Sequence, residues 1–492
     1  MHNPARLLLI SQNHAPADLL MMEKIHDADS KDMFRPPKLP FELFDLIAQD
    51  VIRKAAEEGD ANTMKTCSLV LSDWRIPFQR ALFKIKVPYL QFSEYATQEE
   101  KNIIYDLRNL LDSNPNFQQV ITSLRLRILG SGTLPGSTAD FTPSLLSQLT
   151  SVATLRISQV QPGGRRHSWT SLTGEAQAGV SALLRSPSLR HLDIPWFDAP
   201  LAITFQEGVE IHAVSITSDR FPHQVQSDYY LLDGSDPNWD SAADPSIRPC
   251  VIRHLKSVPR LASKILRATR TTRTGARMPI IVSSAMDSLD ITMQEHGELQ
   301  DLRAVLHRTS NLQKLIVFGA CMLCAKHMVA DYLSGGGMDR LFEEPQPKCL
   351  ESLEDIDLAF SLLNKPEELI KVIISEFSLY PPENVLKRIT MKIPSFKHVY
   401  DLSLAERLQD DLVALGDLLC NTYRFPFLEH VEVIPGYGLK WERNWELGAS
   451  DSVRYFSKIL EEVRMGLEKM GLGSKFAIGD VRRMVGLWKE RV

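Results

Sequence analysis

The sequence predicts an α/β fold in which parallel strands are joined by helical crossovers, preceded by a short helical module. One strand template, with apolar residues at its first, fourth and sixth positions, recurs from Ile121 to Val433. Segments of helical periodicity lie between successive matches. Amphipathic helical patterns also fill residues 39–83, ahead of the first match. Such alternation over about three hundred residues favours parallel strands, because parallel neighbours need long crossover connections.

Composition places the chain among ordinary soluble proteins. Of its 492 residues, 44% are hydrophobic and 24% are charged. No window approaches the 18 apolar residues of a membrane-spanning helix, and the short apolar start lacks the features of a signal peptide. Six cysteines are too few for a disulfide framework. We therefore expect an intracellular protein, cytoplasmic or nuclear, with no membrane partner and a mobile extension over residues 1–35.

Residues 36–90 are expected to form a helical module. Pro40 suits a helix start, since the first turn has no acceptor for the missing N–H. Apolar residues then recur at helical spacing on one face. They are Leu39, Leu43, Leu46, Ile47 and Val51.

Two further helices complete the expected module. The break at residues 57–60 ends the first helix, and Asp60 or Asn62 can cap the second. Pro77 suits the first turn of a third. Because about 45 residues bury too little surface among themselves, a partner or the rest of the chain must cover the apolar side chains.

The module resembles an F-box, on Leu39-Pro40 with Glu42, Leu43 and Ile47, then Cys67-Ser68-Leu69-Val70 and Trp74; the trailing Arg80-Ala81-Leu82-Phe83 resembles the form common in fungi. A longer loop between the first two helices, at residues 53–62, departs from the family. The resemblance implies an adaptor that binds a Skp-family protein, and through it a cullin-RING ubiquitin ligase, while the remaining chain selects protein substrates. It also assigns Skp contacts, or the small core that supports them. These are Leu39, Pro40, Leu43, Ile47, Leu69, Val70 and Trp74.

Residues 119–440 carry the repeated template, after a linker helix expected within residues 91–118. The pattern resembles a leucine-rich repeat. Within each of two groups, Leu126 to Ile194 and Ile291 to Val433, successive strand anchors lie 26 to 42 residues apart, and no Asn occupies the position that bonds the turn backbone in regular repeats. We therefore expect an irregular solenoid with long loops. A closed α/β barrel is the alternative, which uneven spacing disfavours. Residues 441–492 are expected to form a C-terminal helical cap, with a last helix over residues 478–488.

The segment 245–286 contains nine basic residues and no acidic one, in a chain of net charge −5. Pro259 can open a helix that places Arg260, Lys264 and Arg267 on one face. A solvated helix followed by a flexible loop explains this composition. The alternative is a docking patch, including Arg270, for an acidic or phosphorylated substrate. Nucleic acid is disfavoured because no aromatic residue is interleaved among the arginines.

No motif demands chemistry. The sequence has no P-loop, no GxSxG elbow, no HExxH and no dinucleotide fingerprint. Cys321, Cys324 and His327 lack a second pair of metal ligands and are typical of a buried helix face. We expect no catalytic residue, cofactor or metal. The remaining alternatives are a protein-binding scaffold with no ligase role and an unrecognised enzyme.

Overall fold

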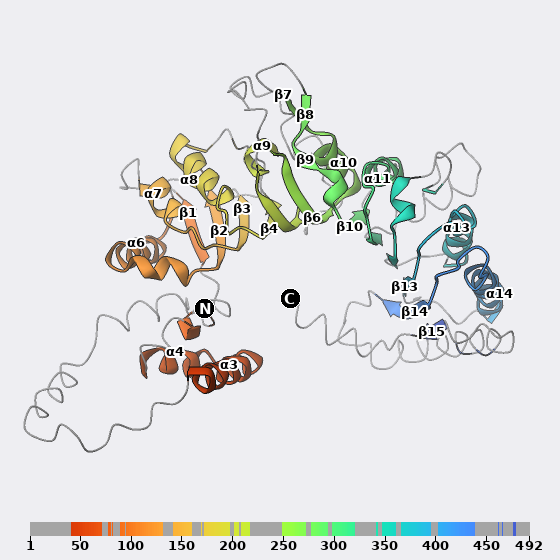
Figure 1. Cartoon of the computed structure of the whole chain (residues 1–492), viewed down its shortest axis with the longest axis horizontal. Coiled ribbons are helices and arrows are strands. Elements are labelled where there is room, and N and C mark those ends of the chain that lie inside the picture. The colour runs from red at the N-terminus through yellow and green to blue at the C-terminus, as the bar shows by residue number, and fades with distance from the viewer. Residues whose placement is uncertain are drawn as a thin grey trace, which may run out of the picture. The chain divides into compact units, whose positions relative to one another are not determined.

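A computed structural model gives the fold. It describes these residues: 41–70, 77–79, 81, 89–93, 95–130, 141–159, 169, 172–196, 201–205, 208–216, 248–271, 277–293, 298–319, 341–342, 347–360, 366–394, 402–437, 461, 465 and 476–478. The chain divides into two compact units, Met1–Ala199 and Pro200–Val492. Both are α/β with parallel strands, so the predicted fold class is confirmed at that level (Figure 1).

The first unit contains a helical module and four parallel strands. The module has α3 (Phe41–Glu58) and α4 (Ala61–Val70). The strands follow in the order β1 (Tyr89–Ser93), β2 (Ser123–Leu129), β3 (Thr154–Gln159) and β4 (His191–Trp196). The connections contain α6 (Gln98–Ser113), the 3-10 helix η1 (Pro115–Gln119), α7 (Phe141–Ser147) and α8 (Gly174–Leu184). Figure 1 shows α6, α7 and α8 along one side of these strands.

The parallel array begins earlier than expected. The alternating stretch Lys84-Ile85-Lys86-Val87, which suits a short strand, lies outside the described residues. Instead β1 starts at Tyr89, and Leu90 and Phe92 are buried where it pairs with β2. The segment expected as a linker therefore supplies a strand and a crossover helix of the sheet. Thr97 opens that helix, α6, with a capping box to Glu100.

The second unit repeats this architecture. Its parallel strands are β5 (Glu210–Ser215), β6 (Cys250–Ser257), β10 (Ser288–Met293), β11 (Lys314–Gly319), β12 (Asp355–Phe360), β13 (Arg388–Pro394), β14 (His430–Tyr437) and β15 (Phe476–Ile478). A short β9 (Ile281–Val282) pairs with β6. The helical segments are α9 (Leu201–Thr204), α10 (Pro259–Arg267), η5 (Ser283–Ala285), α11 (Glu298–Leu306), η6 (Lys348–Glu351), α13 (Pro366–Ser378) and α14 (Leu402–Leu419).

The sequence contains eight clear matches to the template, centred on Leu124, Leu155, Leu192, Leu289, Leu315, Ile356, Ile389 and Val431, and a weaker one at Val214; all nine of these central residues lie in strands. The apolar residues of the matches form the core, each at most 7% exposed except for the half-buried Leu358. The turns before several strands share one hydrogen-bond pattern, in which a backbone carbonyl accepts from two successive N–H groups of the next repeat. The Thr122 carbonyl accepts from the backbone N–H groups of Ala153 and Thr154, at 2.8 and 3.0 Å. The Gln313 carbonyl does so from Glu354 and Asp355, both at 2.9 Å. The irregular spacing therefore resides in the connections and not in the stacking of strands.

Other polar side chains take the place of the missing Asn ladder. The Ser186 hydroxyl donates to the Thr150 carbonyl at 2.9 Å, and the Ser352 hydroxyl donates to the Leu312 carbonyl at 3.0 Å. The buried Asn384 amide donates to the Arg424 carbonyl at 2.9 Å. Each bond joins the turn before one strand to the turn before the next strand, so it holds adjacent repeats together.

Two expectations about this unit were wrong. The repeat does not stop after Val433, because β15 pairs in parallel with β14. Ile478, expected to begin the last helix, is the last residue of that strand. In addition, one explanation of the basic segment placed a flexible loop after the helix. Instead, α10 is followed by β7 (Thr269–Thr271) and β8 (Arg277–Pro279), which pair as an antiparallel hairpin. The rest of the expected cap, apart from Glu461 and Met465, and the segment 321–333 lie outside the described residues.

Candidate docking surfaces

A tight turn joins the first two helices of the module. Gly59 adopts a positive φ of 68°, which favours glycine because it has no Cβ. Asp60 then caps α4, accepting from the backbone N–H groups of Asn62 and Thr63 at 3.0 and 3.1 Å. The Thr63 hydroxyl also donates to Asp60, and these bonds lower the pKa of the carboxyl. The long loop expected over residues 53–62 is therefore wrong, because α3 runs to Glu58.

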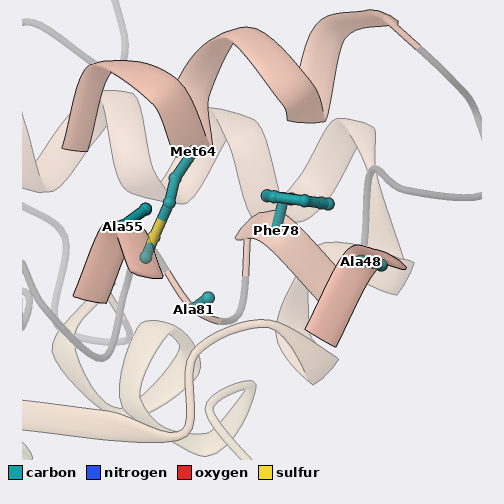
Figure 2. Packing of buried hydrophobic residues seen from close by; sticks show 5 residues of the cluster. All are labelled: Ala48, Ala55, Met64, Phe78 and Ala81. Atoms are coloured by element: carbon teal, nitrogen blue, oxygen red, sulfur yellow. The ribbon is translucent and has the colours of Figure 1, made fainter. Parts of the chain in front are cut away.

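A small core holds the module together. Its buried side chains come from α3, from α4 and from the helical residues 77–79 and 81 (Figure 2). They are Ala48, Ala55, Met64, Phe78 and Ala81, with Val51, Ile52 and Cys67 partly buried against them. Two alanines on α3 let the larger Met64 and Phe78 fit close to its backbone. The two fully enclosed residues in the described part of α3 are therefore small and seven residues apart, which is about two turns, while Val51 and Ile52 pack at the edge of the core.

Leu46 and Ile47 of α3 are exposed to solvent. Their exposed fractions are 60% and 44%. The sequence predicted both on one apolar face with Val51, to be covered by a partner or by the rest of the chain. The structure leaves Leu46 and Ile47 accessible, whereas Val51 packs against the small core. These two adjacent aliphatic side chains form a small apolar surface, which is a candidate docking point.

The other predicted Skp contacts are less completely described. Leu43 lies in α3, and Leu69 and Val70 lie in α4, but their side chains are outside the described part. Leu39, Pro40 and Trp74 are not among the described residues at all. Within the described part, Ile47 is thus the predicted contact whose side chain can be placed, and it is accessible.

The predicted basic helix is present as α10. Pro259 occupies its first turn, and the buried face contains Leu261 and Ile265, both 4% exposed or less. Arg260 and Arg267 are exposed and Lys264 is half-buried. Lys264 and Arg267 also lie in the last turn, where cations stabilise the helix dipole. Arg270 follows in β7, with its side chain outside the described part.

The nine basic residues do not form one surface. Arg253 and Lys256 belong to β6, a strand that the sequence analysis missed. Both are already paired: Arg253 lies 3.1 Å from Glu210, and Lys256 lies 3.5 Å from Asp290. Two of the nine are therefore neutralised on β6 and three lie on α10, while the side chains of Arg270, Arg273 and Arg277 are outside the described part.

The strand surface of the second unit is also charge-balanced across β12 and β13. Within the described residues, cross-strand ion pairs run along it. They are Lys387 with Glu354 (2.9 Å), Arg388 with Asp355 (3.9 Å) and Lys392 with Asp357 (2.5 Å). Because its charges satisfy one another, this surface favours no strongly charged ligand.

Burial shifts the pKa values of His254, Cys250 and Cys349 in the second unit. His254 Nδ1 lies 2.9 Å from the Ser288 hydroxyl, across the β6–β10 pair, and burial lowers the pKa of His254. Burial raises the pKa of the Cys250 and Cys349 thiols to about 12, so both are protonated and poor nucleophiles near neutral pH.

The described residues contain no group of three His, Cys, Asp or Glu side chains placed to hold a metal ion. Cys321, Cys324 and His327 fall outside them. None of the helices in the described ranges is long and apolar enough to cross a membrane.

Comparison with known proteins adds no family. No protein-family model matches the chain, and a search of curated proteins found no match.

Proposed function

We propose that the chain is the substrate-recognition adaptor of a Skp/cullin/F-box ubiquitin ligase, with the helical module binding the Skp-family protein and the strand-bearing units binding substrates. The observation that carries this proposal is the exposure of Leu46 and Ile47 on α3. A neighbouring face of the same helix closes the small core through Ala48 and Ala55. A helix that packs on one face and exposes aliphatic side chains on another is suited to docking.

The expected contribution of this surface follows from its size. Covering an exposed aliphatic side chain stabilises a complex by up to about 1.5–3 kcal/mol. Leu46 and Ile47 together therefore supply part of the affinity, and neighbouring side chains of the module supply the rest. The adaptor itself performs no bond chemistry. It raises the effective concentration of the substrate at the ligase.

Co-purification with a Skp-family protein tests the proposal. We expect the tagged full-length chain to retain this protein, and Ile47→Glu to abolish retention, because a carboxylate would be buried at the contact. Ala56→Glu is the matched control, since Ala56 is exposed on the same helix and lies 2.5 turns from Ile47, on the opposite side.

Two results would contradict the proposal. The first is a wild-type chain that never retains the Skp-family protein, which leaves a protein-binding scaffold without a ligase role. The second is equal loss of binding in Ile47→Glu and Ala56→Glu with unchanged melting temperatures, which would place the contact elsewhere on the chain.

A further inference from the structure

The strand surface of the first unit carries three arginines that strand register brings together. Arg125 and Arg127 lie on β2, and Arg156 lies on β3 directly beside Arg125. Neighbouring strands are about 4.8 Å apart, and alternate residues of one strand are about 6.6 Å apart. The three side chains project from the face opposite the buried Leu124 and Leu126, which the crossover helices cover.

This arrangement is unfavourable for folding alone. Like charges directly opposite each other on neighbouring strands destabilise a sheet. Arg156 is partly compensated by Asp193 on β4, at 3.4 Å. Within the described residues, Arg125 and Arg127 have no ion-pair partner. The contrast with the charge-balanced strands of the second unit indicates that an anion completes this surface.

Neutral side chains position one of the arginines. Arg127 donates to the Tyr89 hydroxyl at 3.3 Å and to Gln91 Oε1 at 3.4 Å. Gln91 is in turn bonded to Glu100, which is already engaged in capping α6. The Arg127 guanidinium is therefore held in place by partners that leave its charge available.

We infer that this surface binds a phosphorylated peptide segment of the substrate, through Arg125, Arg127 and Arg156. A guanidinium binds a phosphate oxygen pair bidentately, and one dianionic phosphate can accept from several guanidinium groups. A single-stranded nucleic acid is disfavoured because it needs a basic track along its backbone, whereas these arginines occupy two strands. The statement that the phosphorylated peptide belongs to a substrate rests on the proposed function.

Fluorescence anisotropy with the purified full-length chain tests the inference. The probe is a degenerate peptide library with a fixed central phosphothreonine, compared with the same library unphosphorylated. We expect the phosphorylated library to bind at least tenfold more tightly. Arg125→Gln and Arg156→Gln should each weaken binding about tenfold, since a charge-assisted bond to phosphate is worth at least the ~1.4 kcal/mol of a tenfold change in Kd.

The matched control is Arg308→Gln, which removes an exposed arginine after α11 in the other unit and should leave binding unchanged. Arg267→Gln on α10 tests the basic patch that the sequence offered for the same class of ligand. Arg125→Lys keeps the charge without the fork and should lose less than Arg125→Gln. The melting temperature of each variant is measured beside its affinity. Because Arg125 and Arg156 are exposed, we expect their substitution to leave the melting temperature unchanged.

Four results would overturn the inference: no binding of the phosphorylated library to the wild type, equal binding of the unphosphorylated library, loss of binding in Arg267→Gln but not in Arg125→Gln, or tighter binding of a single-stranded oligonucleotide of equal charge. Peptide binding is measured on the chain alone. A failure here is thus distinct from a failure to retain a Skp-family protein.

Discussion

Tyr380 offers a sharp test of the packing in the second unit. Its ring lies 5.0 Å from that of Phe342, 5.9 Å from Phe425 and 6.1 Å from Phe377, and the residue is 1% exposed. Its hydroxyl has no hydrogen-bond partner within the described part of the chain. Burial accordingly raises the pKa of Tyr380 well above its usual value. The hydroxyl is therefore a cost to folding and not a contribution to it.

Tyr380→Phe removes that cost. An unpaired buried hydroxyl costs about 1–3 kcal/mol. The void left by one oxygen is smaller than a methyl group and costs less than about 1 kcal/mol. We therefore expect Tyr380→Phe to raise the free energy of unfolding by up to about 2 kcal/mol.

Urea denaturation of the full-length chain, followed by tryptophan fluorescence, measures this change. The control is Tyr423→Phe, the same chemical change at a side chain that is 85% exposed, which should alter stability by less than about 0.5 kcal/mol. If Tyr380→Phe instead lowers the free energy of unfolding by more than 1 kcal/mol, as a lost hydrogen bond would, the reasoning is refuted.

Three other predictions concern stability. Asn384→Ala should cost about 2–4 kcal/mol in urea denaturation, since two buried backbone groups lose their partners, and a loss below 1 kcal/mol would exclude a joint between repeats. Ser257→Ala should be neutral or stabilising by about 1 kcal/mol, because the buried Ser257 hydroxyl has no partner among the described residues; a marked loss would show a missed bond. At alkaline pH, the raised pKa values of Cys250 and Cys349 stabilise the fold fully below pH 9, and this contribution is lost as the pH rises towards 12, at about 1.4 kcal/mol per pH unit and thiol. Cys250→Ala should make that slope of unfolding free energy against pH shallower, and an unchanged slope would contradict the assignment.

The sequence predicted the strands well because burial imposes a simple pattern. Each template match places apolar side chains on one strand face, and the core requires that face. The strand β6 was missed for the same reason. Ile252 and Leu255 follow the template, but Ser257 occupies its third apolar position, although Ser257 is fully buried.

Features that depend on pairing or on small residues were not accessible from the sequence. The buried residues in the described part of α3 are Ala48 and Ala55, which carry little hydrophobic signal beside Leu46 and Ile47. The three arginines of the first unit are 31 residues apart at their extremes, and the register of β2 with β3 brings Arg125 and Arg156 side by side. Composition instead directed attention to Arg260 and its neighbours, which are closer in sequence.

The most direct measurement is the affinity of the purified full-length chain for a Skp-family protein by isothermal titration, for the wild type, Ile47→Glu and Ala56→Glu. The proposed docking surface predicts that the wild type and Ala56→Glu bind with equal Kd and that Ile47→Glu binds at least about tenfold more weakly. Equal affinities of the two variants, or a wild type without measurable heat of binding, would contradict it.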